Sequence, residues 1–386
     1  MSPRFKREYM EKIFLRYKKA KTRAQKSALI TELCTTCNWH RKHAIRQLSN
    51  FKRFTKPKPK KRGKPSKYNK PEIIEILERI WLAAYMPCSK NLKAAIPIWI
   101  PSYQIEYGSI PNNTIKLLYQ ISPSTLDRIL KPVRVRYTGK GRSTTKPGTL
   151  IRNHIPIKTD QWDESRPGFI EADTVAHCGD TIEGMYANTL DTVDIATGWT
   201  EQRAVWGKGY AGVMEQIIDI EHSLPFPLLG FDADNGGEFI NWHLYRHFKE
   251  RKDLVEYTRS RAYKKNDNAH VEQKNWTHVR QWFGYVRLDN PRVIPLMNDL
   301  YKSEWRLYHN FFCPSMKLKD KKRIASKVIK CYYSPKTPYQ RVLESRHVSA
   351  KLKNNLKEQF VGLNPFRLRR AIDKKISQIL KVNRQK

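Results

Sequence analysis

Apolar residues recur at three-to-four spacing through the first third of the chain, a pattern typical of amphipathic helices. Residues 1–50 contain three such stretches, and the segment 36–39 (TCNW) predicts a short turn before a basic helix. This arrangement is typical of a helix-turn-helix module. The basic residues expected on the open face of its last helix are Arg41, Lys42 and Arg46.

A second helical module is expected over residues 71–136, after a basic, proline-rich linker at 51–70. Within this module Ser122 is a good N-cap, and Pro123 fits the first turn of the helix that follows. We interpret this helix as a recognition helix. Its polar side carries the basic residues Arg128, Lys131 and Arg134. A second linker is expected over residues 137–160.

Beyond residue 160 the pattern changes to strands that alternate with helices. Strands are expected at 169–175, 186–195, 200–205, 228–232 and 254–258. Helices are expected at 210–221 and 238–251, with a long helix from about residue 269. Three strands in a meander followed by α/β units predict a mixed five-stranded sheet with flanking helices. This is the order of a ribonuclease-H-like α/β core, here over residues 161–310. Residues 311–386 are expected to form a basic, mainly helical C-terminal region.

The net charge of the chain indicates what kind of partner it binds. The 386 residues include 74 Lys and Arg against 36 Asp and Glu, a formal net charge of +38. Such a charge costs self-repulsion and favours a polyanionic partner, so we expect the two helical modules to bind double-stranded DNA. The six cysteines are scattered, and we find no stretch suited to secretion or membrane insertion. The sequence therefore predicts a cytoplasmic or nucleoid-associated protein.

Three acidic residues lie in segments that suit metal-dependent chemistry. Asp234 lies in LGFDADNGGEFIN, where an apolar run leads into a tight Asn-Gly turn. Asp173 lies in the strand-like PGFIEADTVAH, and Glu272 lies in NDNAHVEQKNW, which opens a helix. Phosphodiester chemistry without a protein nucleophile requires two divalent ions, one for the attacking oxygen and one for the leaving oxygen. Three carboxylates would hold two Mg²⁺ or Mn²⁺ ions.

The flanks of these acids resemble the catalytic core of retroviral integrases and of the integrase-like DDE transposases of bacterial insertion sequences. EADTVAH is similar to the motif of the first Asp, DADNGGEF to that of the second, and NDNAHVEQKN to that of the Glu. The resemblance covers roughly residues 160–310, and the paired N-terminal modules with TPYQRVL extend it along the chain. It implies a transposase that cleaves and joins DNA by direct transesterification. The zinc module of the viral enzymes does not match residues 1–50, so zinc is not implied.

The resemblance also implies roles for individual residues. The implied metal ligands are Asp173, Asp234 and Glu272. Gln273 and Asn275, beside Glu272, would contact the DNA end, and Lys274 would continue a basic surface. A basic loop before this helix is interpreted as a phosphate-binding loop. Its basic residues are Arg259, Arg261, Lys264 and Lys265. Because two DNA ends must be joined, we expect a homodimer or larger assembly on DNA.

Other interpretations stay open at this point. The competing acids are Asp191, Asp232 and Glu238. A tyrosine recombinase would use a Tyr nucleophile, and its His-x-x-Arg signature occurs at 43–46 and again at 243–246. A nuclease of the same fold would cut without joining, and an inactive core would leave a DNA-binding regulator. A zinc site is disfavoured because its Cys and His pairs would lie too close together. The residues concerned are Cys34, Cys37, His40 and His43.

Overall fold

The computed structural model describes most of the chain. The described residues are 3–51, 67–138, 165–233, 238–239, 241–253, 255–259, 269–324 and 327–385. Contacts divide the chain into two compact units, Met1–Ser66 and Lys67–Lys386. The two linkers expected from the sequence fall mostly outside the described residues. Among the helices that the structure describes, none has the length and apolar character needed to cross a bilayer.

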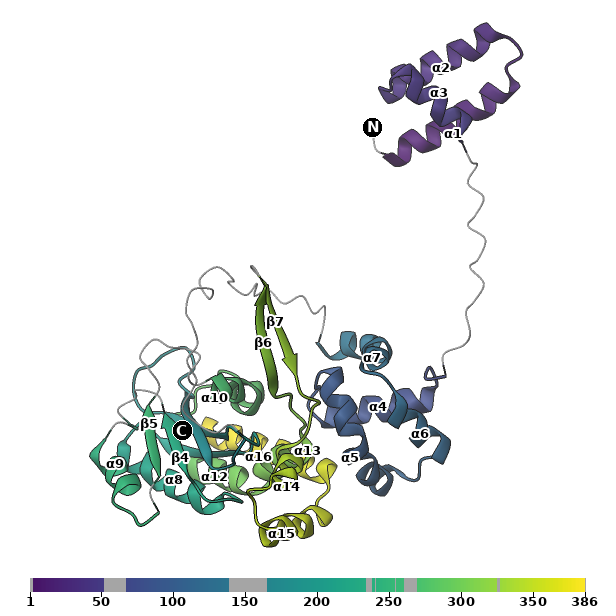
Figure 1. Cartoon of the computed structure of the whole chain (residues 1–386). Coiled ribbons are helices and arrows are strands. Elements are labelled where there is room, and N and C mark those ends of the chain that lie inside the picture. Colours follow the sequence, from purple (N-terminus) through teal and green to yellow (C-terminus); the bar gives the residue numbers. More distant parts are fainter. Residues whose placement is uncertain are drawn as a thin grey trace. The chain divides into compact units, whose positions relative to one another are not determined.

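The described part of the first unit, residues 3–51, folds into the helices labelled α1, α2 and α3 in Figure 1. They are α1 (Pro3–Lys19), α2 (Arg23–Cys37) and α3 (Arg41–Ser49). Their apolar faces meet around Ile13, Leu33 and Leu48, which are all buried. Helix α2 ends because Asn38 adopts the left-handed conformation at φ 53°, where its N–H bonds to the Cys34 carbonyl. The turn before the basic helix therefore lies where the sequence predicts it.

Four helices open the second unit. They are α4 (Pro71–Ala83), α5 (Ser89–Tyr107), α6 (Asn112–Gln120) and α7 (Pro123–Thr138). The predicted N-cap of α7 is confirmed, since Ser122 Oγ accepts the Thr125 N–H at 3.2 Å. These helices share one hydrophobic core with the rest of the unit. Trp99 is fully buried there, and its indole N–H donates to the Phe312 carbonyl at 3.0 Å.

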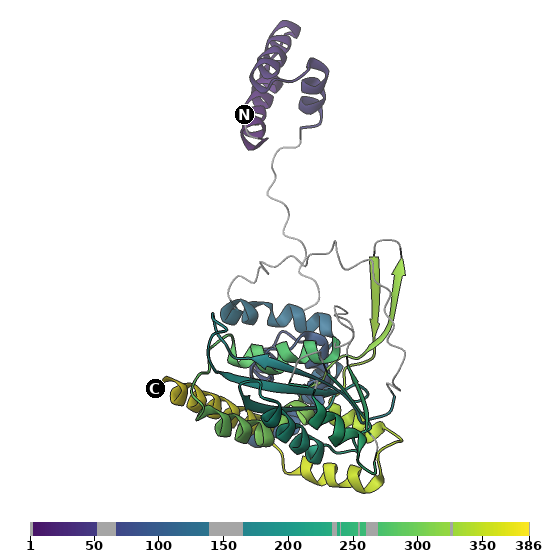
Figure 2. The ribbon, with the colours of Figure 1, turned by 90° about the vertical axis from the view of Figure 1, so that its left-hand side faces the viewer.

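A five-stranded sheet lies at the centre of the second unit (Figure 2). Its strands are β1 (Phe169–Ala176), β2 (Ala187–Asp194), β3 (Thr200–Trp206), β4 (Gly230–Ala233) and β5 (Glu256–Arg259). Their order is β3-β2-β1-β4-β5. The first three strands form an antiparallel meander, whereas β4 and β5 run parallel to β1. This confirms the mixed sheet order of a ribonuclease-H-like core.

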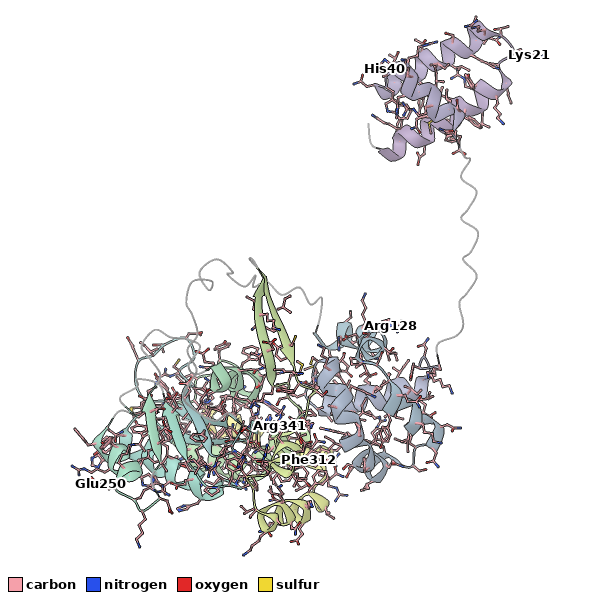
Figure 3. The ribbon with its side chains drawn as sticks, viewed as in Figure 1. Lys21, His40, Arg128, Glu250, Phe312 and Arg341 are labelled. Atoms are coloured by element: carbon pink, nitrogen blue, oxygen red, sulfur yellow. The ribbon has the colours of Figure 1, made fainter. Side chains whose placement is uncertain are left out.

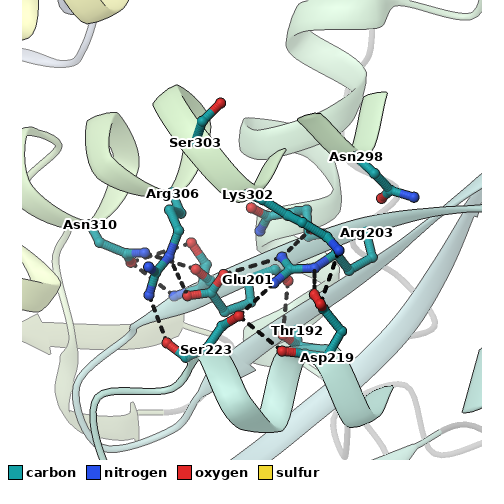
Figure 4. Close-up of polar contacts among 12 residues, drawn as sticks. Thr192, Glu201, Arg203, Asp219, Ser223, Asn298, Lys302, Ser303, Arg306 and Asn310 are labelled. Carbon is teal, nitrogen blue, oxygen red and sulfur yellow. Dashed lines mark hydrogen bonds and ion pairs between the residues drawn. The ribbon is translucent and has the colours of Figure 1, made fainter. Parts of the chain in front are cut away.

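Helices cover the sheet and are bound to it by polar as well as apolar contacts. They are α8 (Tyr210–Ser223), α9 (Trp242–Lys249), α10 (Ala269–Lys274), η1 (Asn275–Arg280), α11 (Gln281–Phe283), α12 (Val293–Leu300), η2 (Tyr301–Trp305) and α13 (Arg306–Phe312). Strand β3 lies between α8 and the η2–α13 helix (Figure 4). There the buried Arg203 pairs with Glu201 at 3.3 Å and with Asp219 at 2.5 Å, and Arg306 pairs with Glu201 at 3.0 Å. These ion pairs fix both helices to the edge of the sheet.

The described part of the C-terminal region is mainly helical but contains a hairpin that the sequence did not predict. It begins with a hairpin of two strands, β6 (Leu318–Ile324) and β7 (Lys327–Tyr332). The helices α14 (Pro338–Glu344), α15 (Ala350–Val361) and α16 (Pro365–Arg384) follow. Helix α16 packs on α5 and α12, so the end of the chain closes the shared core.

Candidate active site

Strand β1 places Asp173 on the sheet. Neighbouring positions in a strand point to opposite faces, so Glu171 and Asp173 share one face of β1. Asp173 is half-buried. The parallel register pairs Ala172 with Ala233, the residues that directly precede Asp173 and Asp234 in the sequence. Asp234 itself lies outside the described residues, as does the Asn-Gly turn that follows it.

Two hydrogen bonds hold the Glu272 helix against β1. The Val271 N–H donates to Glu171 Oε2 at 3.1 Å, and Asn275 Nδ2 donates to Asp173 Oδ2 at 2.6 Å. The first bond satisfies one of the N–H groups that every helix leaves open in its first turn. Glu272 lies between these two anchors and is exposed. The structure therefore brings the Asp173 and Glu272 segments together, although they are far apart in the sequence.

Sequence reasoning missed Glu171. It is almost fully buried, with 4% of its surface exposed, and its carboxylate accepts the bond that fixes the start of α10. Its signal in the sequence was the EAD motif, in which an acid two positions before Asp173 must share the same strand face. A carboxylate is favoured at this place because the N-terminus of a helix carries partial positive charge.

Two ionisable side chains with shifted pKa values, Asp191 and Lys274, lie near the candidate site. The antiparallel register places Asp191 opposite Asp173, and Gln202 Nε2 donates to Asp191 Oδ1 at 2.7 Å. Burial raises the pKa of Asp191 to about 7. Burial also lowers the pKa of Lys274 to about 8, with a contribution from a nearby arginine, while the charge of Asp191 opposes this shift. Lys274 is half-buried at the end of α10, and a DNA contact by Lys274 stays a prediction.

The other competing acids have partners of their own. Thr258 Oγ1 donates to Asp232 Oδ1 at 2.7 Å across the β4–β5 pair. Glu238 is buried and accepts a hydrogen bond from Thr174 Oγ1 at 3.0 Å, with Lys208 Nζ at 3.1 Å. Burial acts to raise the pKa of Glu238, but these hydrogen bonds and its own backbone N–H together hold that pKa below its usual value. Thr174 lies on the face of β1 opposite to Asp173, so Glu238 is on the other side of the strand.

Comparison with known proteins identifies a relative over most of the chain. The uncharacterized protein y4rM of Sinorhizobium fredii is 38% identical over 338 residues, which is 86% of this chain and 94% of that protein. The chain belongs to the same family as y4rM. No protein-family model matches the chain.

Two solved structures were also matched. The catalytic core domain of BIV integrase is 16% identical, with a TM-score of 0.30, over 47% of this chain and 96% of that one. A chain of the simian T-cell lymphotropic virus intasome in complex with PP2A regulatory subunit B56 gamma is 14% identical. Its TM-score is 0.31, over 54% of this chain and 68% of that one. The assignment of the fold rests on the strand order of the sheet rather than on these scores.

The side chains beside Asp173 offer oxygen donors of the kind that Mg²⁺ and Mn²⁺ prefer. Glu272 supplies an exposed carboxylate. Among the described atoms, Asn275 Oδ1 is buried without a hydrogen-bond partner, so this amide oxygen would be free for a cation or water. Within the described part of the chain, no cluster of three or more His, Cys, Asp and Glu side chains is placed to hold a metal ion. Asp234 does not belong to that part.

The predicted DNA contacts of the first unit lie on α3. Lys42 and Arg46 are exposed. Arg41 is exposed as well, but its guanidinium donates to Ser27 Oγ at 2.6 Å and Thr31 Oγ1 at 2.9 Å on α2. Lys42 and Arg46 are therefore the residues of this group whose side chains have the larger freedom to reach a ligand.

The predicted DNA-contact residues on α7 also differ in whether their side chains are exposed or bonded within the protein. Arg128 and Lys131 are exposed, and Figure 3 shows Arg128 projecting from the helix. Arg134 is half-buried, bonds to Asp127 Oδ1 at 2.8 Å and to Ser89 Oγ at 2.9 Å, and therefore ties α7 to the start of α5.

The predicted phosphate-binding loop falls largely outside the described residues. Arg259 ends β5, where its backbone pairs with Ala233. The loop residues outside the described part are Arg261, Lys264 and Lys265. Gln273 is exposed on α10, whereas Asn275 binds Asp173 instead of pointing to solvent.

Proposed function

We propose that the chain is a DDE transposase that binds the ends of its own insertion sequence and joins them to target DNA. The observation that carries this proposal is the docking of the Glu272 helix on the Asp173 strand through Glu171 and Asn275. It occurs on a sheet of ribonuclease-H-like order, next to the strand that leads into Asp234. The resemblance of the three acidic motifs supports the same function.

In this proposal Asp173, Asp234 and Glu272 hold two Mg²⁺ or Mn²⁺ ions, which would stabilise charge on the attacking and leaving oxygens. Asn275 orients the Asp173 carboxylate through its 2.6 Å hydrogen bond. Glu171 holds the start of α10 and so positions Glu272. The two helical modules and the basic loop bind the DNA backbone and the element ends, and the protein acts as a dimer or larger assembly in the bacterial nucleoid.

The chemistry balances without a protein nucleophile or ATP. Water first attacks a phosphodiester at the element end, the P–O bond to the 3′-oxygen breaks, and a 3′-hydroxyl is released. That hydroxyl then attacks a phosphorus atom of the target strand. One P–O bond forms while another breaks, and the displaced target 3′-oxygen takes up a proton. No covalent adduct between protein and DNA forms at either step.

The test is strand transfer of a labelled end duplex into plasmid DNA with Mg²⁺ or Mn²⁺. Inverted repeats, if found in the DNA beside the gene, would supply the duplex. We compare wild type with Asp173→Asn and Asp234→Asn, and with Asp232→Asn as the matched control on β4. Joined products are expected from wild type and Asp232→Asn, whereas the first two variants bind DNA but join none.

Other outcomes of this assay identify the alternatives. Cutting without joining would indicate a nuclease of the same fold. Binding with neither reaction would indicate a regulator, and a covalent adduct trapped on a suicide substrate would indicate a tyrosine recombinase. Loss of joining in Asp232→Asn but not in Asp234→Asn would move the second ligand to Asp232.

A further inference from the structure

The β6–β7 hairpin is a two-stranded ribbon that the proposed catalytic chemistry does not use. In Figures 1 and 2 it projects from the rest of the second unit. Among the described elements, its strands pack on each other and on no third element to a substantial extent. A two-stranded hairpin is only marginally stable alone in water. A projecting ribbon of this kind therefore gains stability from a partner.

Both faces of the ribbon expose apolar side chains. Its exposed large apolar residues are Leu318, Val328, Ile329, Tyr332 and Tyr333, and each has 41% or more of its surface accessible. The register places Ile329 opposite Lys322, and Val328 opposite Arg323, so the two faces each combine apolar with basic positions. Neither face covers a core of the protein itself.

The charge of the ribbon indicates the chemistry of the partner. Residues 317–333 contain one acid, Asp320, and seven basic residues, which are Lys317, Lys319, Lys321, Lys322, Arg323, Lys327 and Lys330. Positive charges this dense along the chain repel one another. A polyanion would remove this repulsion. A second copy of the chain, with its own charge of +38, would increase it.

The base of the ribbon is fixed to the catalytic sheet. Arg341 donates to the Ser315 carbonyl at 2.5 Å and to Ser315 Oγ at 3.1 Å, just before β6 begins. The same guanidinium donates to the Thr197 carbonyl at 3.0 Å, in the turn between β2 and β3. Arg341, labelled in Figure 3, is half-buried. The ribbon is thus an arm with a rigid base.

We propose that the β6–β7 ribbon binds duplex DNA through the phosphate backbone and one groove. A two-stranded ribbon has the width that the major groove admits. The basic side chains contact phosphates, while the exposed tyrosines and β-branched residues contact sugars and base edges. The identity of the polyanion as duplex DNA rests on the proposed function, and the arm adds a contact surface beyond the helical modules and the active site.

The test measures how DNA binding depends on salt. Lys319, Lys322 and Lys330 are exposed, and a triple Lys→Gln variant at these positions removes three charges from the arm. The matched control replaces Lys351, Lys357 and Lys374 with Gln, which are exposed positions on α15 and α16. The probe is a short fluorescent DNA duplex, and anisotropy gives the dissociation constant over a series of KCl concentrations.

Each lost phosphate contact lowers the slope of log K against log salt by about 0.9. The arm variant is therefore expected to lower the slope by about three, whereas the control keeps the wild-type slope. Equal slopes for the arm variant and the control would overturn the proposal. A changed oligomeric state in light scattering, with the slope unchanged, would also overturn it, because the ribbon would then bind a second copy.

The two proposals fail separately. Wild type that joins DNA, with an arm variant that binds like the control, would refute only the arm. An arm variant with a lowered slope, in a protein whose wild type never joins DNA, would refute only the transposase. Thermal melting of all variants checks that they are folded, which is expected because every substituted side chain is exposed.

Discussion

The attachment of α10 to β1 makes a prediction that does not depend on the proposed reaction. Glu171→Ala removes the carboxylate that accepts the Val271 N–H at 3.1 Å. Val271 is fully buried, so its N–H group gains no water in exchange. The start of α10 should then detach from the sheet more often, and Glu272 should move with it.

The size of the effect follows from the kind of bond that is lost. A hydrogen bond to a charged group contributes about 1.5–3 kcal/mol. Since 1.4 kcal/mol corresponds to a factor of ten, local opening of α10 should become roughly ten- to hundredfold more frequent. Glu171→Gln keeps a carbonyl oxygen as acceptor and loses only the charge at the helix N-terminus. That substitution should cost about 0.3–1 kcal/mol, a change of a few-fold.

Hydrogen exchange followed by mass spectrometry measures this opening directly. Peptides from α10 and η1 should exchange faster in Glu171→Ala than in wild type, with Glu171→Gln in between, while peptides from α16 stay unchanged. The control is Asn298→Ala, which removes two bonds to the Ala204 backbone, at 2.7 and 2.9 Å, on β3. That variant should lower overall stability without selective exchange in α10.

Unchanged exchange of the α10 peptides in a folded Glu171→Ala protein would refute the role of Glu171. Faster exchange everywhere would show a general loss of stability instead. If the proposed function holds, the variant with the faster exchange should also have the slower strand transfer. Glu171→Ala should therefore join DNA more slowly than Glu171→Gln, and Glu171→Gln more slowly than wild type.

Three further predictions concern the stability of the second unit. Arg203→Met leaves the buried Glu201 with one cation fewer and should lower the free energy of unfolding, measured by urea denaturation, by about 3–5 kcal/mol. A loss under about 1 kcal/mol would show that the Arg203–Glu201 ion pair does not stabilise the fold. Burial raises the pKa of Asp194 to about 6, so its contribution to stability is complete below its unfolded pKa and is lost as the pH rises towards 6. Urea denaturation from pH 4 to 7 should show the free energy of unfolding fall by roughly 3 kcal/mol through this group. The fall should be smaller in Asp194→Asn, and an equal dependence on pH in the two proteins would contradict the prediction. Trp282→Ala removes the ring stacked on Tyr85 at 4.0 Å and should cost about 3 kcal/mol, while Trp282→Phe should lower the melting temperature less.

The sheet could be predicted from the sequence because its strands carry strong local signals. Strands β1 to β3 are short segments with several β-branched residues, separated by turns, and β4 leads from an apolar run into an Asn-Gly turn. The cap at Ser122 was predictable for the same reason, because one side chain and one nearby backbone N–H determine it. Features set by neighbours in sequence therefore needed no tertiary information.

The β6–β7 ribbon was not predicted, because neither of its faces is buried. A strand is recognised by apolar positions at every second place, and this signal exists only where one face covers a core. In residues 317–333 lysines occupy both faces, so the segment has the pattern of a solvated charged stretch. The residues of this segment that favour a strand are few and spread out, namely Ile324, Val328, Ile329, Tyr332 and Tyr333.

The contact between Asn275 and Asp173 was also beyond the sequence. Residues 275–280 form a π-helix, which changes the angle between successive side chains. A helical wheel drawn from Glu272 onward therefore misplaces the residues that follow it. Asn275 contacts Asp173, and its expected contact with the DNA end stays a prediction. π-helical turns of this kind are frequent at functional sites.

One turn connects the proposed DNA arm to the candidate active site. Asp194, at the end of β2, accepts the N–H and hydroxyl of Thr197 at 2.7 and 2.6 Å, and Arg341 binds the carbonyl of the same residue. The base of the ribbon is thus held against β2, the strand that pairs with β1 and places Asp191 opposite Asp173. DNA bound along the ribbon would keep a fixed distance from Asp173. Arg341→Met should therefore impair the joining of DNA more than its binding, because the arm would keep its lysines and lose its position.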